Sequence, residues 1–218
     1  MEKESNKSFK TNRDQNLKKL GCYTAFLAIF FLVSCKEEYN QDWRGKDNRD
    51  PKVVQEIEKD HQSLRSKFNA VSTLSFQGGY ENKEKLILEF IKKLSQQESV
   101  SAKALQTEIL TEEEERNIFY PSILGFGYGL DYAKTEDFHA LFTQRKAQGL
   151  ERMHENLFGK KVQKLKIQWS LKQNRFGEMK GEKPEIVTVQ TNTKDVEIES
   201  IKQVVFFKGK YKIAVIAP

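Results

Sequence analysis

The most informative stretch of the chain is Val204-Val205-Phe206-Phe207-Lys208-Gly209-Lys210-Tyr211-Lys212. Apolar residues precede a Lys-Gly pair, and Tyr211, Ile213 and Val215 form an alternating apolar pattern after it. Two such runs joined by two residues that include glycine are typical of a β-hairpin. The stretch therefore predicts that the chain closes with two antiparallel strands and a tight turn at Lys208-Gly209.

Further strands are predicted before this hairpin. The first is marked by apolar residues that nearly alternate, as in a half-buried strand: Val162, Leu165, Ile167, Trp169 and Leu171. Residues 172–184 are predicted to be a polar loop with two glycines, whereas residues 186–191 and 196–207 are predicted strands. With the closing strand, these segments predict an antiparallel sheet of about four strands.

Residues 51–80 are predicted to hold an amphipathic helix and the break that ends it. Asp50-Pro51 is a helix start, because an acid can cap the helix and proline fits its first turn. Apolar residues then recur every three or four positions: Val54, Ile57, Leu64, Phe68 and Val71. A short coiled-coil seam would have the same spacing. Gln77-Gly78-Gly79-Tyr80 breaks the helix.

Residues 81–218 are predicted to be an α+β domain. Helices are expected at residues 82–96 and 136–157, the second with Thr135 as its cap. Thr111-Glu112-Glu113-Glu114 is the capping box of a shorter helix, which we expect Pro121 to end. Helices that precede antiparallel strands are the order typical of α+β proteins.

The order of these elements carries a resemblance. It runs through Leu110-Thr111-Glu112-Glu113-Glu114, Ile118-Phe119-Tyr120-Pro121, Asp137-Phe138, Gly149-Leu150 and the closing hairpin. Over about residues 82–217 the chain resembles bacterial lipoproteins of unknown function with a nuclear-transport-factor-two-like fold, the cone shared with ketosteroid isomerases. The resemblance implies a curved sheet that wraps a helix, with a pocket at its open end. It implies no activity, because one fold hosts many functions.

The amino terminus has the layout of an export signal. Residues 1–19 are polar and basic, and residues 20–34 carry no charge. This apolar run of about 15 residues is shorter than the roughly 20 residues that span a bilayer. It ends in Leu32-Val33-Ser34-Cys35, which resembles the lipobox of bacterial lipoproteins. We predict a signal peptide at residues 1–34, with Leu32, Val33 and Ser34 recognised by the signal peptidase and Cys35 lipidated; a short membrane anchor or buried helix is the alternative.

Residues 35–50 are predicted to be the lipidated end and a flexible tether. The lipid would hold the protein to a membrane of the cell envelope. The residue after Cys35 is lysine rather than aspartate, which favours the outer membrane over the inner. Lys36-Glu37-Glu38 also resembles a surface-export signal of some Gram-negative lipoproteins, with an ordinary solvated tether as the alternative.

The charge of the chain argues against nucleic acid as a partner. The full chain has 37 basic and 31 acidic residues, a net charge of +6. Residues 1–34 hold six basic and three acidic residues, so the mature chain retains only about +3. An electrostatic footprint for nucleic acid needs a stronger and clustered basic excess.

Few residues suggest chemistry. His139 and His154 would lie roughly 22 Å apart on one helix, so they cannot share a metal ion, and we predict no metal or cofactor. Tyr120, His139 and Trp169 are the candidates for lining a pocket, although aromatic residues at such positions are more often core.

Two classes of function follow. The first is a non-catalytic envelope lipoprotein that binds a small hydrophobic ligand or a protein, favoured by the tether, the amphipathic helix and the lack of a catalytic cluster. The alternative is a small-molecule isomerase or hydrolase, which needs a buried Asp or His in the pocket.

Overall fold

The structure is a computed structural model that describes residues 50–218. The predicted signal peptide, the lipobox residues Leu32, Val33, Ser34 and Cys35, and the tether before Asp50 lie outside the described residues. Asp50–Pro218 forms one unit. None of its helices combines the length and apolar character that crossing a membrane requires.

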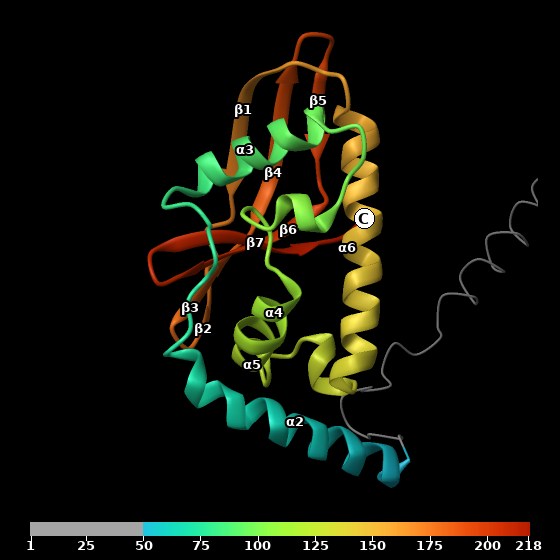
Figure 1. Cartoon of the computed structure of the whole chain (residues 1–218), viewed down its shortest axis with the longest axis vertical. Coiled ribbons are helices and arrows are strands. Elements are labelled where there is room, and N and C mark those ends of the chain that lie inside the picture. The colour runs from blue at the N-terminus through green and yellow to red at the C-terminus, as the bar shows by residue number, and fades with distance from the viewer. Residues whose placement is uncertain (1–49) are drawn as a thin grey trace, which may run out of the picture. The chain divides into compact units, whose positions relative to one another are not determined.

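Within residues 50–218, three long helices frame the domain (Figure 1): α2 (Pro51–Val71), α3 (Lys83–Gln96) and α6 (Thr135–Leu157). They confirm the predicted helices. The side chain of Asp50 caps α2, since it accepts a hydrogen bond from the N–H of Lys52 at 2.9 Å. Shorter helical segments lie between α3 and α6: η1 (Ala102–Leu105), α4 (Glu112–Glu114), η2 (Glu115–Phe119), α5 (Tyr120–Ile123) and η3 (Gly129–Tyr132).

The prediction that Pro121 ends the helix begun at Thr111 is wrong. Thr111 and Glu114 form the predicted capping box, but α4, η2 and α5 run on without a break to Ile123. The η2 segment is a π-helical turn, in which the N–H of Tyr120 donates to the carbonyl of Glu115. A proline lacks the N–H and clashes with the preceding turn of a regular α-helix. The wider π turn explains how Pro121 is accommodated.

The cap of α6 is also different from the prediction. Thr135 is the first residue of α6 rather than its cap. Its N–H and its hydroxyl donate to Oδ2 of Asp60 at 2.7 Å and 2.5 Å. Asp60 belongs to α2, so a residue 75 positions away in sequence satisfies the start of α6 and ties the two helices together.

In the part of the chain from residue 50 to 218, seven antiparallel strands form two sheets, which confirms the predicted α+β class. One sheet has the order β1-β4-β5 and the other the order β2-β3-β6-β7. The strands are β1 (Val162–Trp169), β2 (Asn174–Phe176), β3 (Met179–Glu182), β4 (Pro184–Thr191), β5 (Asp195–Ile198), β6 (Ile201–Phe207) and β7 (Lys210–Ile216). Leu171, predicted to lie in the first strand, follows its end and is fully exposed.

The structure has seven strands within residues 50–218 where the sequence predicts about four, because residues 196–207 divide into β5 and β6 and residues 172–184 contain β2 and β3. β3 leads into β4 across Lys183, and β5 leads into β6 across residues 199–200. In the strand register, Glu182 pairs with Val204 and Val187 pairs with Ile198. Between these two pairs, the β5–β6 segment has one residue more than the β3–β4 segment. An extra residue of this kind bends a sheet. Residues 172–184, predicted to be a loop, contain the β2–β3 hairpin, since a three-residue strand is too short for the pattern to reveal.

The closing hairpin is buried on both sides. Val204 and Ile213 pack in one apolar cluster with α3 and the C-terminal half of α6. Val205 and Ala214 pack in a second cluster with α2, η2 and α5. Successive side chains of a strand point to opposite faces, so a strand between two cores has a continuous apolar run. The Val-Val-Phe-Phe sequence is the result.

Candidate ligand-binding cavity

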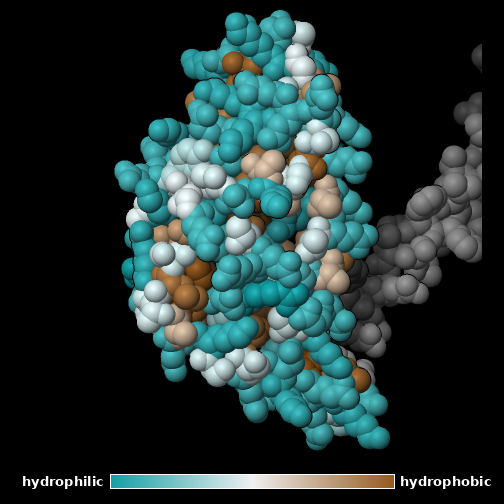
Figure 2. Space-filling view, in the orientation of Figure 1, coloured by the Kyte–Doolittle hydropathy of each residue, from teal (hydrophilic) through white to brown (hydrophobic). Residues whose placement is uncertain are grey.

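A cavity of about 630 Å³ lies beside α6. Its walls come from η2, α5, η3, α6 and the sheet that contains β2, β3 and β6. Half of its apolar lining is aromatic (Phe119, Tyr128, Phe138 and Phe142), and the other half is aliphatic (Ile123, Ala133, Leu141 and Val215). Figure 2 shows that one face of the molecule is mainly hydrophilic, with apolar residues in separate patches. An aromatic cavity of this size has the character of a small-molecule site.

The cavity wall on α6 follows from helical spacing. Phe138, Phe142 and Arg145 are four and three residues apart, so they share one side of the helix. The rings of Phe138 and Phe142 stack with centroids 5.6 Å apart and an interplanar angle of 26°. Arg145 extends the same wall with a guanidinium group. One helix face therefore presents two rings and a cation to the cavity.

Polar side chains complete the lining. Arg145, Lys183 and Lys202 bring three cations, while Asp137 and Glu182 bring two carboxylates. Glu182 is engaged in an ion pair with Lys83. Within residues 50–218, the three cations have no ion-pair partner. The unpaired charge at the cavity is therefore mainly positive.

Gln203 is the buried amide of the cavity. It is only 7% exposed and lines the space from β6. Among the described residues, no hydrogen-bond partner of its side chain is found. A Cβ at residue 181 would displace this amide and the ring of Phe176, so Gly181 leaves the room that Gln203 occupies. An amide that lines a cavity without a hydrogen-bond partner in the described part of the chain is a group that a ligand could satisfy.

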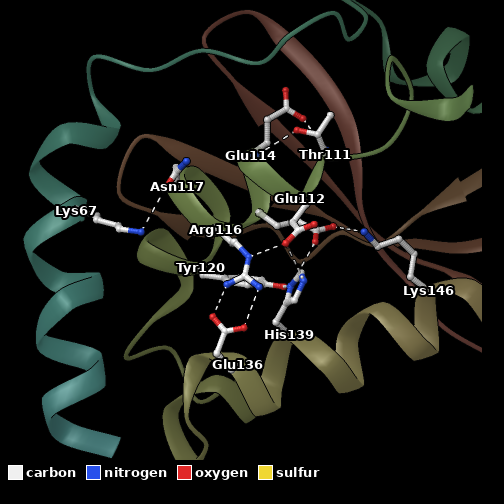
Figure 3. A network of polar contacts seen from close by, with 11 residues as sticks. Lys67, Thr111, Glu112, Glu114, Arg116, Asn117, Tyr120, Glu136, His139 and Lys146 are labelled. Carbon is white, nitrogen blue, oxygen red and sulfur yellow. Dashed lines mark hydrogen bonds and ion pairs between the residues drawn. The ribbon is translucent and has the colours of Figure 1, made fainter. Parts of the chain in front are cut away.

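A polar network lies between η2 and α6 (Figure 3). Glu115 is buried and forms an ion pair with Lys146. Its Oε2 atom has no hydrogen-bond partner among the described residues. Burial raises the pKa of Glu115, and the charge of Lys146 acts in the opposite direction.

Tyr120 and His139 meet in this network. The hydroxyl of Tyr120 and Nδ1 of His139 are hydrogen-bonded at 2.9 Å. Nε2 of His139 lies 3.4 Å from Glu112 Oε1, which favours the tautomer with its proton on Nε2. Burial lowers the pKa of His139, and Arg116 lowers it further. Burial also raises the pKa of Tyr120, so both groups are neutral near pH 7.

Arg116 closes the network toward solvent. Its Nε atom donates to Glu112 at 2.9 Å, and its two terminal nitrogens donate to Glu136 at 2.6 Å and 3.0 Å. This forked hydrogen bond lowers the pKa of Glu136. Because the guanidinium geometry matches a carboxylate, Arg116 joins the π-helical segment to the first turn of α6.

The network supports the cavity rather than lining it. None of Glu115, Tyr120, His139 and Lys146 is among the described residues that line the cavity. The ring of Tyr120 instead packs edge-on against Phe138 and Phe142, with centroids 5.3 Å and 5.9 Å away. The hydrogen bond to His139 therefore fixes a ring that holds the aromatic wall.

The structure brings together two of the three predicted pocket residues. Tyr120 and His139 are in contact, one layer behind the cavity. Trp169 lies elsewhere: its Nε1 atom donates to Glu84 at 3.2 Å, and Lys83 Nζ is 4.2 Å from its ring centroid. It packs beside α3 and has no part in the cavity.

Sequence reasoning missed the polar lining of the cavity. Lys202 and Gln203 interrupt the otherwise apolar strand β6, and this interruption is the signal that could have revealed them. Arg145 follows Phe138 and Phe142 at helical spacing, but exposed arginines on helices are common. Within residues 50–218, no group of three or more His, Cys, Asp or Glu side chains is placed to hold a metal ion.

Comparisons with protein-family models, with curated proteins and with solved structures find no match to this chain.

Proposed function

We propose that this protein is a membrane-anchored envelope lipoprotein whose α+β domain binds a small hydrophobic ligand without catalysing a reaction. The supporting observation is the cavity of about 630 Å³ with its aromatic wall. Ligand pockets are typically 300–1,000 Å³ and mainly apolar, with a few placed polar groups. The extra residue that bends the sheet between β5 and β6 supports the proposal of a cone related to the nuclear-transport-factor-two-like lipoproteins.

The anchor is part of the same proposal. Lipid on Cys35 would hold the domain at the envelope, at the outer membrane in preference to the inner, with the cell surface as a further possibility. Metabolic labelling with palmitate tests it. The wild-type chain should incorporate label, and Cys35→Ala should remain unlabelled and unprocessed. Cys22→Ala is the matched control, because it removes a cysteine from the predicted signal peptide. A labelled Cys35→Ala protein would contradict the anchor.

An isomerase or hydrolase would need a base at the cavity. Glu182 is the buried carboxylate that lines it, and this side chain is engaged with Lys83. Glu115 is buried and its Oε2 has no hydrogen-bond partner in the described part of the chain, but it does not line the cavity. Ligand binding is therefore the function that the geometry favours.

A neutral hydrophobic fluorophore tests ligand binding. The chain from residue 36 onward, which includes the whole unit Asp50–Pro218, is titrated with N-phenyl-1-naphthylamine. We expect saturable fluorescence enhancement that Phe142→Ala weakens, because the variant removes a ring from the cavity wall. Phe158→Ala is the matched control, since Phe158 lies just after α6 and does not line the cavity. Equal binding by both variants, each checked for folding by circular dichroism, would refute the site.

A further inference from the structure

We propose that the ligand is an amphipathic anion: an apolar chain or ring system that ends in a carboxylate or phosphate. The inference rests on the proposed function, since it names the chemical class of ligand for the same cavity. It is carried by three cations without an ion-pair partner within residues 50–218 and by the amide of Gln203, which line a mainly apolar space with an aromatic wall on α6.

The cations come from three separate elements. Arg145 lies on α6, Lys183 lies between β3 and β4, and Lys202 lies on β6. Surface lysines and arginines are often solvated without partners, but here three of them border one apolar cavity. Of the two carboxylates in the lining, Glu182 is already neutralised by Lys83, which leaves Asp137 on α6. A neutral or cationic ligand would leave these charges without compensation.

Arg145 is the residue best suited to an anionic group. A guanidinium presents several donors in a planar fork that matches carboxylate and phosphate oxygens. On α6 it follows Phe142 by three residues and Phe138 by seven, so the cation and the rings share one helix face. A ligand whose apolar part packs on the two rings would have its anionic end near Arg145 and Lys202.

Gln203 provides a neutral donor beside this charge. It is 7% exposed, adjacent to Lys202 in β6, and its amide has no partner among the described residues. An amide that donates to an anion and is shielded from water contributes more than one at the surface. Gln203 is also less exposed than Lys183 and Lys202. The cavity therefore has an aromatic wall and a polar, positively charged side.

Competition between probes that share a twelve-carbon alkyl tail and differ in their head group tests the class of ligand. Dodecanoate, dodecyl phosphate, dodecan-1-ol and dodecyltrimethylammonium, each below its micelle-forming concentration, displace bound N-phenyl-1-naphthylamine from the chain that begins at residue 36. We expect the favoured anion to act at about one tenth of the concentration of the alcohol, because a charged hydrogen bond contributes about tenfold in affinity. The cation should be the weakest competitor. The two anions distinguish a carboxylate from a phosphate head.

Two variants test which cations of the cavity bind the anionic end of the ligand. Arg145→Gln and Lys202→Gln should each reduce the preference for the anion over the alcohol several-fold, where the preference is the ratio of the two competing concentrations measured on the same variant. Arg152→Gln is the control, since Arg152 is an exposed residue of α6 outside the cavity lining. The inference is overturned if dodecan-1-ol competes as well as both anions, or if Arg145→Gln and Lys202→Gln behave like Arg152→Gln. If the fluorophore and all four probes fail to bind, the proposed function itself is refuted.

Discussion

Lys212 Nζ lies 2.8 Å from Glu114 Oε2, and both side chains are buried between β7 and α4. Glu114 also accepts hydrogen bonds from the N–H groups of Gln77 at 2.7 Å and Thr111 at 2.8 Å. Lys212 donates to the carbonyl of Gln106 at 2.7 Å. Burial lowers the pKa of Lys212, and its hydrogen bond to Glu114 acts in the opposite direction. The pair therefore joins the closing strand to three segments of the helical half.

Removing the lysine should be strongly destabilising. Lys212→Met leaves the carboxylate of Glu114 buried without its cation, and breaking such a pair costs about 3–5 kcal/mol of unfolding free energy. Urea denaturation at pH 7 measures this. Arg65→Met breaks the exposed pair with Glu58 and should barely move the unfolding midpoint. Similar midpoints for the two variants would show that the buried pair does not support the fold.

Glu115 should make stability depend on pH. Burial raises its pKa above the ordinary value of 4.5, so between the two values the folded chain binds more protons than the unfolded chain. The contribution of Glu115 to the free energy of unfolding is therefore complete below pH 4.5. It is lost as the pH rises through the raised pKa of the folded state.

The amide variant isolates this contribution. Because Gln does not titrate, the unfolding free energy of Glu115→Gln relative to wild type should increase as the pH rises above 4.5. Urea denaturation at several pH values between 4 and 8 measures the difference. The control is Glu151→Gln, which replaces an exposed acid of α6. A difference that does not change with pH would count against the raised pKa of Glu115.

The sequence predicts the closing hairpin well because both of its strands are apolar and its turn contains glycine. It also predicts the α+β class, because apolar residues recur with a helical period in the first half of the domain and with a strand period in the second half. It misses the bend at Lys183 and residues 199–200, because residues 172–184 have the composition of a polar loop and an interruption of two residues does not end the strand pattern of residues 196–207. It also misses Asp60 as the cap of α6, since no local pattern indicates a partner from another helix.

The candidate site is less predictable than the fold. Tyr120 and His139 can be selected as unusual side chains, but their contact depends on the π-helical turn of η2. Without that turn, a regular helix would point Tyr120 in a different direction. Trp169 is equally unusual in sequence, yet it packs against Lys83 and Glu84. Aromatic residue type alone does not separate a cavity wall from a contact elsewhere.

Gly149 lets β7 approach α6. A Cβ at this position would lie 2.7 Å from Ile216 Cγ2 and 3.1 Å from backbone atoms of Ala217. In an exposed helix, Gly→Ala stabilises by about 1 kcal/mol. Here we expect Gly149→Ala to destabilise by about 1–3 kcal/mol, because the backbone of β7 must move. Thermal or urea unfolding tests the sign, with the exposed Gln148→Ala as the neutral neighbour. A higher unfolding free energy for Gly149→Ala than for wild type would show that β7 can move away from α6 without loss of stability.

Asp60 should hold α2 to the rest of the domain. Its carboxylate satisfies the N–H and hydroxyl of Thr135, and the next residue, His61, has Nε2 3.0 Å from the carbonyl of Ala133. Asp60→Ala removes the cap and should cost about 0.5–2 kcal/mol, with faster hydrogen exchange in the first turn of α6. Asp60→Asn keeps an acceptor oxygen and should retain most of the protection.

Lys59→Ala is the matched control for this cap, because Lys59 is exposed one position earlier on α2. It should change the unfolding free energy by less than about 0.5 kcal/mol and leave exchange at Thr135 unaltered. If the amide hydrogens in the first turn of α6 exchange at the same rate in Asp60→Ala and Lys59→Ala, water replaces the carboxylate of Asp60 without loss of stability there. In that case α2 is held by Leu64 and Val71, which are buried in the second apolar cluster, and the cap contributes little to its attachment.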